Sequence, residues 1–381
     1  MAGSATTQGV VGLQHNVPDI DAPHIAQLRR AGAIPLARTN LSDFALRWHT
    51  ANELHGATRN PWDETRTPGG SSGGDAAALA TGMSCLGVAN DYGGSLRIPA
   101  QFCGVASIRP TLGRVPMASV LEPKNRPMTP QLMSVQGPMA RRVRDLRLAL
   151  RSMSGPDPRD PWWTPAPFEG TVLTRRVAMW IGGDDVQVDD GVRSAAESLA
   201  DAGYDIEVSE PPRWREAAQL WRALVSSDTR LVLEVVGGLF GREGREWADL
   251  LFDATTDLDK AGYIRGWIER QDIARDWSLF QAHRPLVLAP VSTRRPFLIG
   301  RDIDGNEGTT EVVNSMRPAV VANLLGLPAA AVPVGTADGL PRGVQIIGPR
   351  YREDACLDAA QAIEDRIGIV TPIDPLPART I

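Results

Sequence analysis

The sequence predicts an α/β fold, with a mixed β-sheet at its core and helices covering both faces of the sheet. Strand-like and helical segments alternate along the chain, and a βαβ unit near its middle shows this most clearly. There, RRVAMWIG is strand-like, and apolar residues follow at the helical spacing i, i+3, i+4, i+7 and i+8 between residues 192 and 200. The segment DIEVSE then returns as a second strand.

The other elements follow the same alternation. The pattern PHIAQLRR predicts an amphipathic helix that ends at a glycine, and AGAIPLAR predicts a short buried strand directly after it. In GPMARRVRDLRLALRSM, the residues Val143, Leu146 and Leu150 share one helix face. Toward the C-terminus, RPLVLAPVS and RGVQIIG predict strands, VVANLLGLPAAAVPVG predicts a helix and a strand, and residues 354–366 predict a final helix.

Composition excludes several classes of protein. The 381 residues are 43% hydrophobic and 22% charged, which is sufficient for a large buried core. The net charge of −5 is spread without long runs of one sign, so no groove for nucleic acid is expected. The opening residues show neither the basic nor the apolar region of a leader peptide, and no stretch approaches about 20 apolar residues, so neither a leader nor a membrane helix is expected. Cys85, Cys103 and Cys356 form no CxxC pair, which argues against disulfides and zinc and favours a reducing, cytoplasmic location.

Two glycine-serine segments are the strongest candidates for a functional site. The run GGSSGG, residues 69–74, precedes a predicted helix but lacks the partner residues of a phosphate-binding loop. The turn Gly93-Gly94-Ser95 lets several backbone N–H groups converge near a hydroxyl, as an oxyanion hole requires. No G-x-S-x-G elbow is present. A Ser-His-Asp triad stays open at this point, and it would draw on His15, His24, His49, His55 or His283.

These segments closely resemble the amidase signature family. The run NPWDETRTPGGSSGGDAAALATG is followed by DYGGSLRIPAQFCGVASIRPTLGRVP, and 24 positions separate Ser71 from Ser95 as in that family. Upstream, TTQG and AGAIPLARTNLSDFA are similar to two further family segments, and MRPAVVANLLGLPAAAVPVG is similar to the closing one. The resemblance is dense over residues 2–142 and 317–365.

The resemblance implies a single amidase-type domain over residues 1–381. It would comprise a signature core over 2–142, a variable helical region on the substrate side over about 205–316, and a closing core segment over 317–370. Against the family's fold, the first elements would be missing. The acyl and amine pockets are expected from residues 117–136 and 213–316.

The resemblance also assigns roles to residues. Ser95 would be the nucleophile that forms an acyl-enzyme, and Tyr92, Gly93, Gly94 and Ser95 would supply the oxyanion donors. Ser71, after a cis peptide bond, would relay the proton. The family's enzymes need no metal and no cofactor.

The neighbouring residues are expected to play structural parts. Ser72, Asp91 and Arg97 are expected to support the turns through hydrogen bonds. Cys103 is expected to be a buried, unreactive thiol. Met128, Met133 and Trp221 are expected to pack in the core, as are the other tryptophans between residues 213 and 284.

One family residue has no counterpart in the sequence. The family's base is a lysine that precedes the TT-x-G segment, and here that segment begins at Thr6. Lys124 and Lys260 are the only lysines, and neither matches the motif. Arginine is not a base near neutral pH, so Arg38 does not replace it. Three explanations stay open: a start assigned too late, a shortened homologue, and another group acting as base. The first two predict exposed apolar surface beside the signature core.

The leading interpretation is an amidase that cleaves the carboxamide C–N bond of a small molecule. Its partners would include neither nucleic acid nor membrane, and a homodimer is compatible with it. A catalytically silent or truncated homologue is one alternative. The glutaminase subunit of a tRNA-dependent amidotransferase is another.

Overall fold

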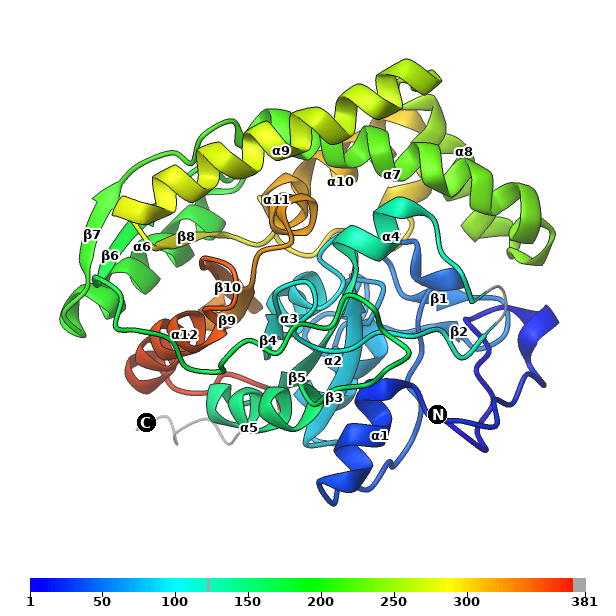
Figure 1. Cartoon of the computed structure of the whole chain (residues 1–381), viewed down its shortest axis with the longest axis horizontal. Helices are drawn as coiled ribbons and strands as arrows, with labels where there is room; N and C mark the ends of the chain where they lie inside the picture. Colours follow the sequence, from blue (N-terminus) through cyan, green and yellow to red (C-terminus); the bar gives the residue numbers. More distant parts are fainter. Residues whose placement is uncertain (122–123, 373–381) are drawn as a thin grey trace.

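The computed structural model describes residues 1–121 and 124–372. At the centre of these residues lies an eight-stranded mixed sheet with the strand order β3-β5-β4-β9-β10-β8-β6-β7 (Figure 1). Its strands are β3 (Leu86–Asp91), β4 (Ala106–Arg109), β5 (Val135–Ala140), β6 (Arg176–Met179), β7 (Asp205–Val208), β8 (Leu286–Pro290), β9 (Ala329–Ala337) and β10 (Leu340–Ile347). A separate hairpin pairs β1 (Ala51–Asn52) with β2 (Gly56–Ala57).

Strand β6 pairs in parallel with β7 and β8, and the other pairs in the large sheet are antiparallel. The predicted βαβ unit is therefore confirmed. Its helix, α6 (Val186–Asp201), buries Val192, Ala195 and Leu199. Ala200 is exposed, because eight helical steps of about 100° carry it to the edge of the apolar face.

Helices cover both faces of the sheet, as predicted, and enclose two hydrophobic cores. Successive residues of β9 alternate between them: Ala329 and Ala331 face one core, and Ala330 and Val332 face the other. One face carries α1 (Pro23–Arg30), α5 (Val143–Met153), α6 and α12 (Glu353–Ile367). The other carries α2 (Gly73–Ala80), α3 (Arg97–Cys103) and α11 (Arg317–Leu325).

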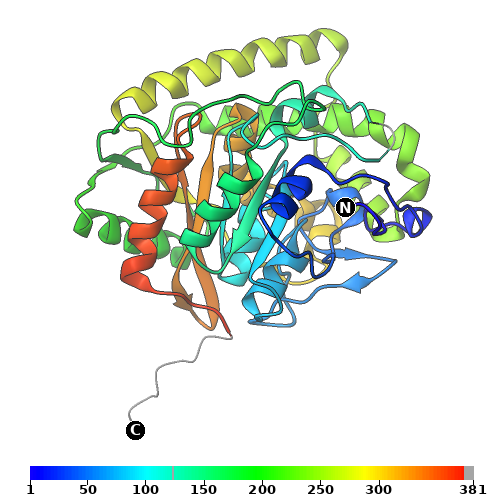
Figure 2. The same cartoon turned by 60° about the horizontal axis from the view of Figure 1, so that its bottom comes forward.

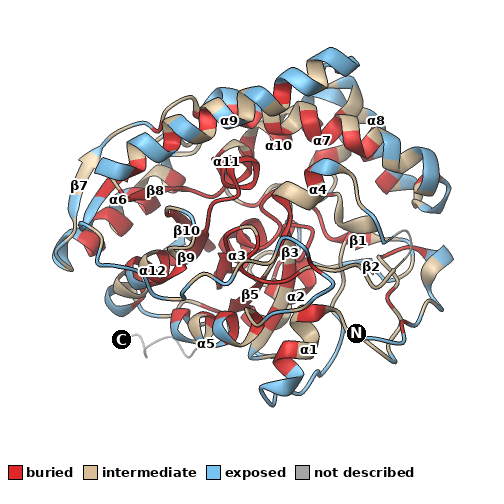
Figure 3. Cartoon of the chain, viewed as in Figure 1, coloured by how far each residue is buried: buried red, intermediate tan, exposed pale blue. Residues whose placement is uncertain are grey.

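An outer layer of helices lies over α11. It consists of α7 (Trp214–Val236), α8 (Arg242–Asp253), α9 (Lys260–His283) and α10 (Gly305–Ser315), while α4 (Met128–Met133) lies between this layer and the sheet (Figures 1 and 2). The inner faces of these helices are buried and their outer faces exposed (Figure 3). Trp214, Trp221, Trp247 and Trp277 are buried, as predicted for this region, whereas Trp267 is only half-buried and packs against the edge of the same core. None of the described helices is both long and apolar enough to span a bilayer.

The buried strand predicted directly after α1 is wrong. Residues 31–38 belong to no strand and are exposed, with Ile34 at 82% and Leu36 at 73% exposure. The apolar residues of this segment are compatible with an extended conformation. A β-strand also needs a neighbouring strand to complete its hydrogen bonds, and this segment has none. The two side chains leave apolar surface exposed close to Thr39, whose hydroxyl donates to Asp75 of α2 at 2.7 Å.

Candidate active site

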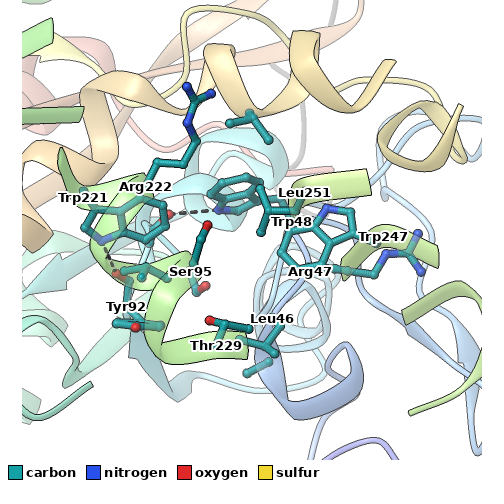
Figure 4. A pocket seen from close by; sticks show the side chains of 15 residues that line it. Leu46, Arg47, Trp48, Tyr92, Ser95, Trp221, Arg222, Thr229, Trp247 and Leu251 are labelled. Atoms are coloured by element: carbon teal, nitrogen blue, oxygen red, sulfur yellow. Dashed lines mark hydrogen bonds between the residues drawn. The ribbon is translucent and has the colours of Figure 1, made fainter. Parts of the chain in front are cut away.

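Ser95 lies in the turn that joins β3 to α3. The preceding Gly94 has φ +93°, and a Cβ there would lie 2.7 Å from Ile98 Cδ1 and 2.8 Å from Ala319 Cβ. Only glycine fits this position, both in conformation and in space. Ser95 is 6% exposed, and it lines a pocket (Figure 4).

The carboxylate of Asp91 holds this turn through hydrogen bonds. It accepts hydrogen bonds from the backbone N–H of Gly94 at 3.0 Å and of Leu96 at 3.3 Å. Arg97 binds it in a bidentate pair at 2.9 and 3.0 Å. Burial alone would raise the pKa of Asp91, but the charges of Arg97 and Arg109 and the hydrogen bonds of Arg97 and Asn323 hold that pKa far below its usual range. Asp91 therefore stays charged and holds the turn in place.

Hydrogen bonds to the carbonyl groups orient the peptides of the turn. The indole N–H of Trp221 donates to Tyr92 O at 3.2 Å, and that of Trp48 donates to Gly93 O at 2.9 Å. The backbone N–H of Ile98 donates to Gly94 O at 2.8 Å. In a trans peptide the N–H points opposite to the C=O, so the N–H groups of Gly93 and Ser95 point away from Trp221 and Ile98 respectively.

The expected oxyanion donors differ in what they already bind. Gly94 N–H donates to Asp91, so it can reach an oxyanion only by leaving or sharing that bond. In residues 1–121 and 124–372, the N–H groups of Tyr92, Gly93 and Ser95 donate to no other residue.

Ser71 lies in the glycine-rich loop before α2, after a cis Gly70–Ser71 peptide bond as the resemblance implies. Thr50 ties the loop together: its hydroxyl donates to Gly69 O at 2.9 Å and accepts from Gly73 N at 2.9 Å. A Cβ on Gly69 would lie 2.9 Å from Pro99 Cα, so the loop packs against the first turn of α3. The fold thus brings the two serine segments together, although no hydrogen bond joins Ser71 to Ser95 in the described structure.

The residues expected to support the turns take up structural positions. Arg97 donates to Asp91, Gln345 and Asn323, and all of these groups are buried. Ser72 is the N-cap residue of α2, but its side chain makes no capping hydrogen bond, so the expected support through that hydroxyl is not seen. Burial raises the pKa of the Cys103 thiol, which keeps it protonated and unreactive.

Three tryptophans and one tyrosine help to line the pocket beside Ser95. Its enclosed cavity volume is only about 40 Å³, and the space around it widens to about 540 Å³ when the open solvent at its mouth is included. The ring of Trp48 lies 6.3 Å from that of Trp221 and 6.2 Å from that of Trp247, at nearly a right angle to the latter. The remaining lining residues are Ala45, Leu46, Arg47, Tyr92, Gly93, Arg222, Val225, Ser226, Thr229, Leu251 and Val313.

This lining only partly matches expectation. More than half of it comes from residues 213–316, but none comes from 117–136. Met133 is fully buried and Met128 is 45% exposed, and neither reaches the pocket. Trp221 is buried as predicted, yet it also lines the pocket. Trp48 was missed, because nothing in its local sequence indicates that it packs beside residue 221.

Comparison with known proteins identifies the family. The family model described as Amidase matches residues 1–357. The chain belongs to the amidase family. It is 40% identical over 377 residues to an indoleacetamide hydrolase of Bradyrhizobium diazoefficiens, covering 97% of this chain and 72% of that protein.

A second sequence relative and a solved structure also match the chain. The chain is 31% identical over 401 residues to one of the subunits of the glutamyl-tRNA(Gln) amidotransferase of Roseiflexus castenholzii, covering 95% of this chain and 80% of that one. The structure of 6-aminohexanoate cyclic dimer hydrolase with its substrate superposes with a TM-score of 0.83 at 27% identity, covering 96% of this chain and 82% of that chain. The predicted family and fold are confirmed.

The amidase has no Ser-His-Asp triad among its described residues. His49 is the histidine nearest in sequence to the pocket residue Trp48, but its Nδ1 contacts the Thr67 hydroxyl at 3.0 Å. Burial lowers the pKa of His49. Lys124 and Lys260 are exposed and do not line the pocket. Across the described ranges, no group of three or more His, Cys, Asp or Glu side chains could hold a metal ion.

Proposed function

We propose that this amidase is a serine hydrolase that cleaves a carboxamide C–N bond through an acyl-enzyme on Ser95. The observation that carries the proposal is the turn at residues 92–95. Its first three carbonyl groups are each bound by another residue, whereas three of its N–H groups have no acceptor within the described residues. Such preorganised donors stabilise the negative charge that develops on a carbonyl oxygen, and losing one costs about 10²- to 10³-fold in rate.

In this mechanism, Ser95 Oγ attacks the carbonyl carbon as its proton leaves. The carbonyl oxygen becomes an oxyanion, held by the N–H groups of Gly93 and Ser95 and by that of Tyr92. When the tetrahedral intermediate collapses, the C–N bond breaks and the amine takes a proton. Water then attacks the acyl-enzyme and releases the acid, which restores the Ser95 hydroxyl.

Ser71 is proposed to carry the proton between Ser95 and the leaving amine. Its loop packs on the first turn of α3, which follows Ser95 in the chain, and its hydroxyl has no competing hydrogen bond within the described structure. Catalytic hydrogen bonds often form only once substrate is bound, so the missing Ser71–Ser95 bond is compatible with this role.

The group that finally accepts the proton can be distinguished by a pH profile. A base within the protein would give a rate that titrates and reaches a plateau. Direct attack assisted only by hydroxide would instead give a rate that rises tenfold with each pH unit and shows no plateau. Measuring Ser95 acylation from pH 6 to 10 therefore separates a third catalytic group from its absence.

The pocket supports a planar aromatic acyl group as substrate. Trp48, Trp221 and Trp247 surround it, and aromatic pairs in such contacts contribute about 0.5–1.5 kcal/mol beyond burial. The relative at 40% identity is an indoleacetamide hydrolase, which supports an arylacetamide such as indole-3-acetamide. The glutaminase alternative is weaker, because the described lining contains no carboxylate for the ammonium group of glutamine.

The test is labelling of the full chain with a fluorophosphonate probe, followed by mass spectrometry of the labelled peptide. We expect labelling at Ser95, its loss in Ser95→Ala, and its retention in Ser226→Ala, which removes another hydroxyl of the same pocket. Ammonia release from indole-3-acetamide should exceed that from glutamine. Labelling that persists in Ser95→Ala would contradict the proposal. Binding of indole-3-acetamide without labelling would indicate a catalytically silent homologue.

A further inference from the structure

A series of hydrogen bonds joins Tyr92, in the turn beside the proposed nucleophile, to the outer helices. The Tyr92 hydroxyl lies 2.5 Å from the hydroxyl of Thr129 on α4. Thr129 donates from that hydroxyl to Asp228 Oδ2 at 2.7 Å, and its backbone N–H donates to the same oxygen at 2.7 Å. Tyr263 of α9 donates to Asp228 Oδ1 at 2.8 Å. We call the connection from Tyr92 through Thr129 to Asp228 the Tyr92 link.

The direction of each hydrogen bond in the Tyr92 link follows from the groups involved. The carboxylate of Asp228 only accepts, so Thr129 gives it a proton and can only accept from Tyr92. Burial raises the pKa of the Tyr92 hydroxyl above its ordinary value, so this hydroxyl stays protonated and can donate. Hydrogen bonds to a charged group are stronger than neutral ones, and connected hydrogen bonds reinforce one another. The link therefore holds the side chain of residue 92 firmly.

Helix α7 holds residue 92 at a second point. Trp221 and Asp228 lie seven residues apart on α7, and this spacing places both on one face of the helix. Trp221 donates from its indole N–H to Tyr92 O at 3.2 Å (Figure 4). Thr129 and Asp228 are 0% and 7% exposed, so water does not compete strongly for the link. The same helix thus fixes the backbone of residue 92 directly and its side chain through α4.

Residue 92 joins two peptides whose N–H groups belong to the proposed oxyanion hole. The carbonyl oxygen of the first peptide, Asp91 O, accepts from Arg109 at 2.9 Å and from Asn323 at 3.1 Å. The carbonyl oxygen of the second peptide is the one that Trp221 binds. The dihedral angles φ and ψ of Tyr92 set the angle between these two peptide planes. Its side chain shares the same Cα, so a fixed hydroxyl restricts the rotation of both planes.

From these contacts we propose that Asp228 is a positioning residue of the oxyanion hole: through Thr129 it holds the hydroxyl of Tyr92, and so it keeps the N–H groups of residues 92 and 93 aimed at the oxyanion. The ring of Tyr92 also lines the pocket, so the same link fixes part of its wall. None of the described residues of 117–136 lines the pocket, but Thr129 supports it from outside. The inference rests on the proposed function, since it concerns the oxyanion formed at Ser95.

The kinetics of Ser95 labelling test the Tyr92 link. The maximal labelling rate and the half-saturating fluorophosphonate concentration are measured on the full chain. Tyr92→Phe removes the hydroxyl and keeps the ring, so we expect the maximal rate to fall about tenfold and the half-saturating concentration to change less than about twofold. Tyr351→Phe is the matched control and should label like wild type, because it removes a hydroxyl bond to Leu112 O outside the pocket.

Thr129 provides a conservative pair of variants. Thr129→Val has the shape of threonine but lacks the hydroxyl that accepts from Tyr92. Thr129→Ser keeps that hydroxyl, so it should label at least about fivefold faster than Thr129→Val. A role of Thr129 in packing alone would favour valine, because valine keeps the methyl group that serine loses. The order of the two rates therefore separates positioning through the hydroxyl from packing.

Asp228→Asn weakens the other end of the link, and we expect labelling to slow about fivefold. Its control is Asp160→Asn, because Asp160 is similarly buried at 9% exposure and accepts from the N–H groups of Met117 and Trp162. Combining Asp228→Asn with Tyr92→Phe should slow labelling by less than about twofold beyond Tyr92→Phe alone, because both changes break one link.

Two results would overturn the inference. One is labelling within about twofold of wild type in both Tyr92→Phe and Asp228→Asn, and the other is slowing of the same size in their controls. Melting temperatures of all variants show whether each one folds, and Tyr92→Phe carries the test if Asp228→Asn does not.

Failure of the proposed function is seen separately, because Ser95 of wild type would then stay unlabelled. Hydrogen exchange tests the link in that case. The N–H groups of Gly94 and Leu96 donate to Asp91, so their exchange reports the order of the turn. They should exchange at least about fivefold faster in Tyr92→Phe than in Tyr351→Phe. Equal exchange in the two variants would contradict a positioning role of the link.

Discussion

Trp48 donates its indole N–H to the carbonyl oxygen of Gly93 across 2.9 Å. The same indole forms a wall of the pocket, in contact with the rings of Trp221 and Trp247. One side chain therefore shapes the space for a substrate and also fixes the peptide beside the nucleophile. A substrate ring that displaces Trp48 would disturb the turn as well.

Replacing Trp48 with Phe tests this double role. Phenylalanine keeps an aromatic wall but removes the donor to Gly93 O. We expect Ser95 labelling to slow by about tenfold or more, in line with the loss of one contact that orients the oxyanion donors. Trp163→Phe is the matched control, because it removes an indole bond to the carbonyl of Ser154 far from the pocket. An equal slowing in both variants would show a general effect on folding.

Gly94→Ala should be destabilising and should abolish labelling. Its φ of +93° disfavours alanine, and the new Cβ would lie within 2.8 Å of Ile98 and Ala319. We expect a loss of about 2–4 kcal/mol from strain and overpacking together. Gly300→Ala separates these causes: its φ is +89° and nothing lies within 4 Å of the added Cβ. Urea denaturation should give Gly300→Ala a loss of only about 1 kcal/mol.

Asp91→Asn should damage the protein more than a surface substitution of the same kind. It would leave Arg97 and Arg109 buried without their counter-charge, and breaking such a buried pair costs about 3–5 kcal/mol. Asp190→Asn removes the partner of the exposed Arg193 and should cost less than about 1 kcal/mol. Comparable losses in the two variants would contradict the assigned role of Asp91.

Asp75 should make stability depend on pH. Desolvation raises its pKa from 3.8 to about 6, although the Thr39 hydroxyl and the Val88 N–H act against the rise. A carboxyl whose pKa is raised by folding favours the folded state below its unfolded pKa, and this contribution is lost as the pH rises through the folded pKa. The loss should therefore fall between pH 4 and 7.

The measurement is the free energy of unfolding of wild type and Asp75→Asn at several pH values. Because Asp75 is only partly buried, we expect wild type to lose about 1–2 kcal/mol relative to the variant between pH 4 and 7. A difference that stays constant over this range would show that the pKa of Asp75 is not raised by folding.

Much of the fold and of the catalytic turn could be predicted because both depend on local sequence. The 3.6-residue period of α5 and α6 and the short apolar strands predicted the layered sheet. Likewise, the positive φ at residue 94 requires a glycine, and the glycine before Ser95 can be recognised in the sequence. The same reasoning predicted a strand over residues 31–38 incorrectly, because a strand depends on a partner strand that the local sequence does not specify.

The pocket was decided by tertiary structure alone. Trp48 precedes the serine turn by more than 40 positions, while Trp221, Arg222 and Trp247 follow it by more than 120. Nothing in their spacing relates them, because the distances between their side chains are set by how α7 and α8 pack over α11 and the sheet. The sequence by itself determined where a nucleophile could be presented. Only the packing of segments far apart in the sequence decided that three indoles would line the pocket beside it.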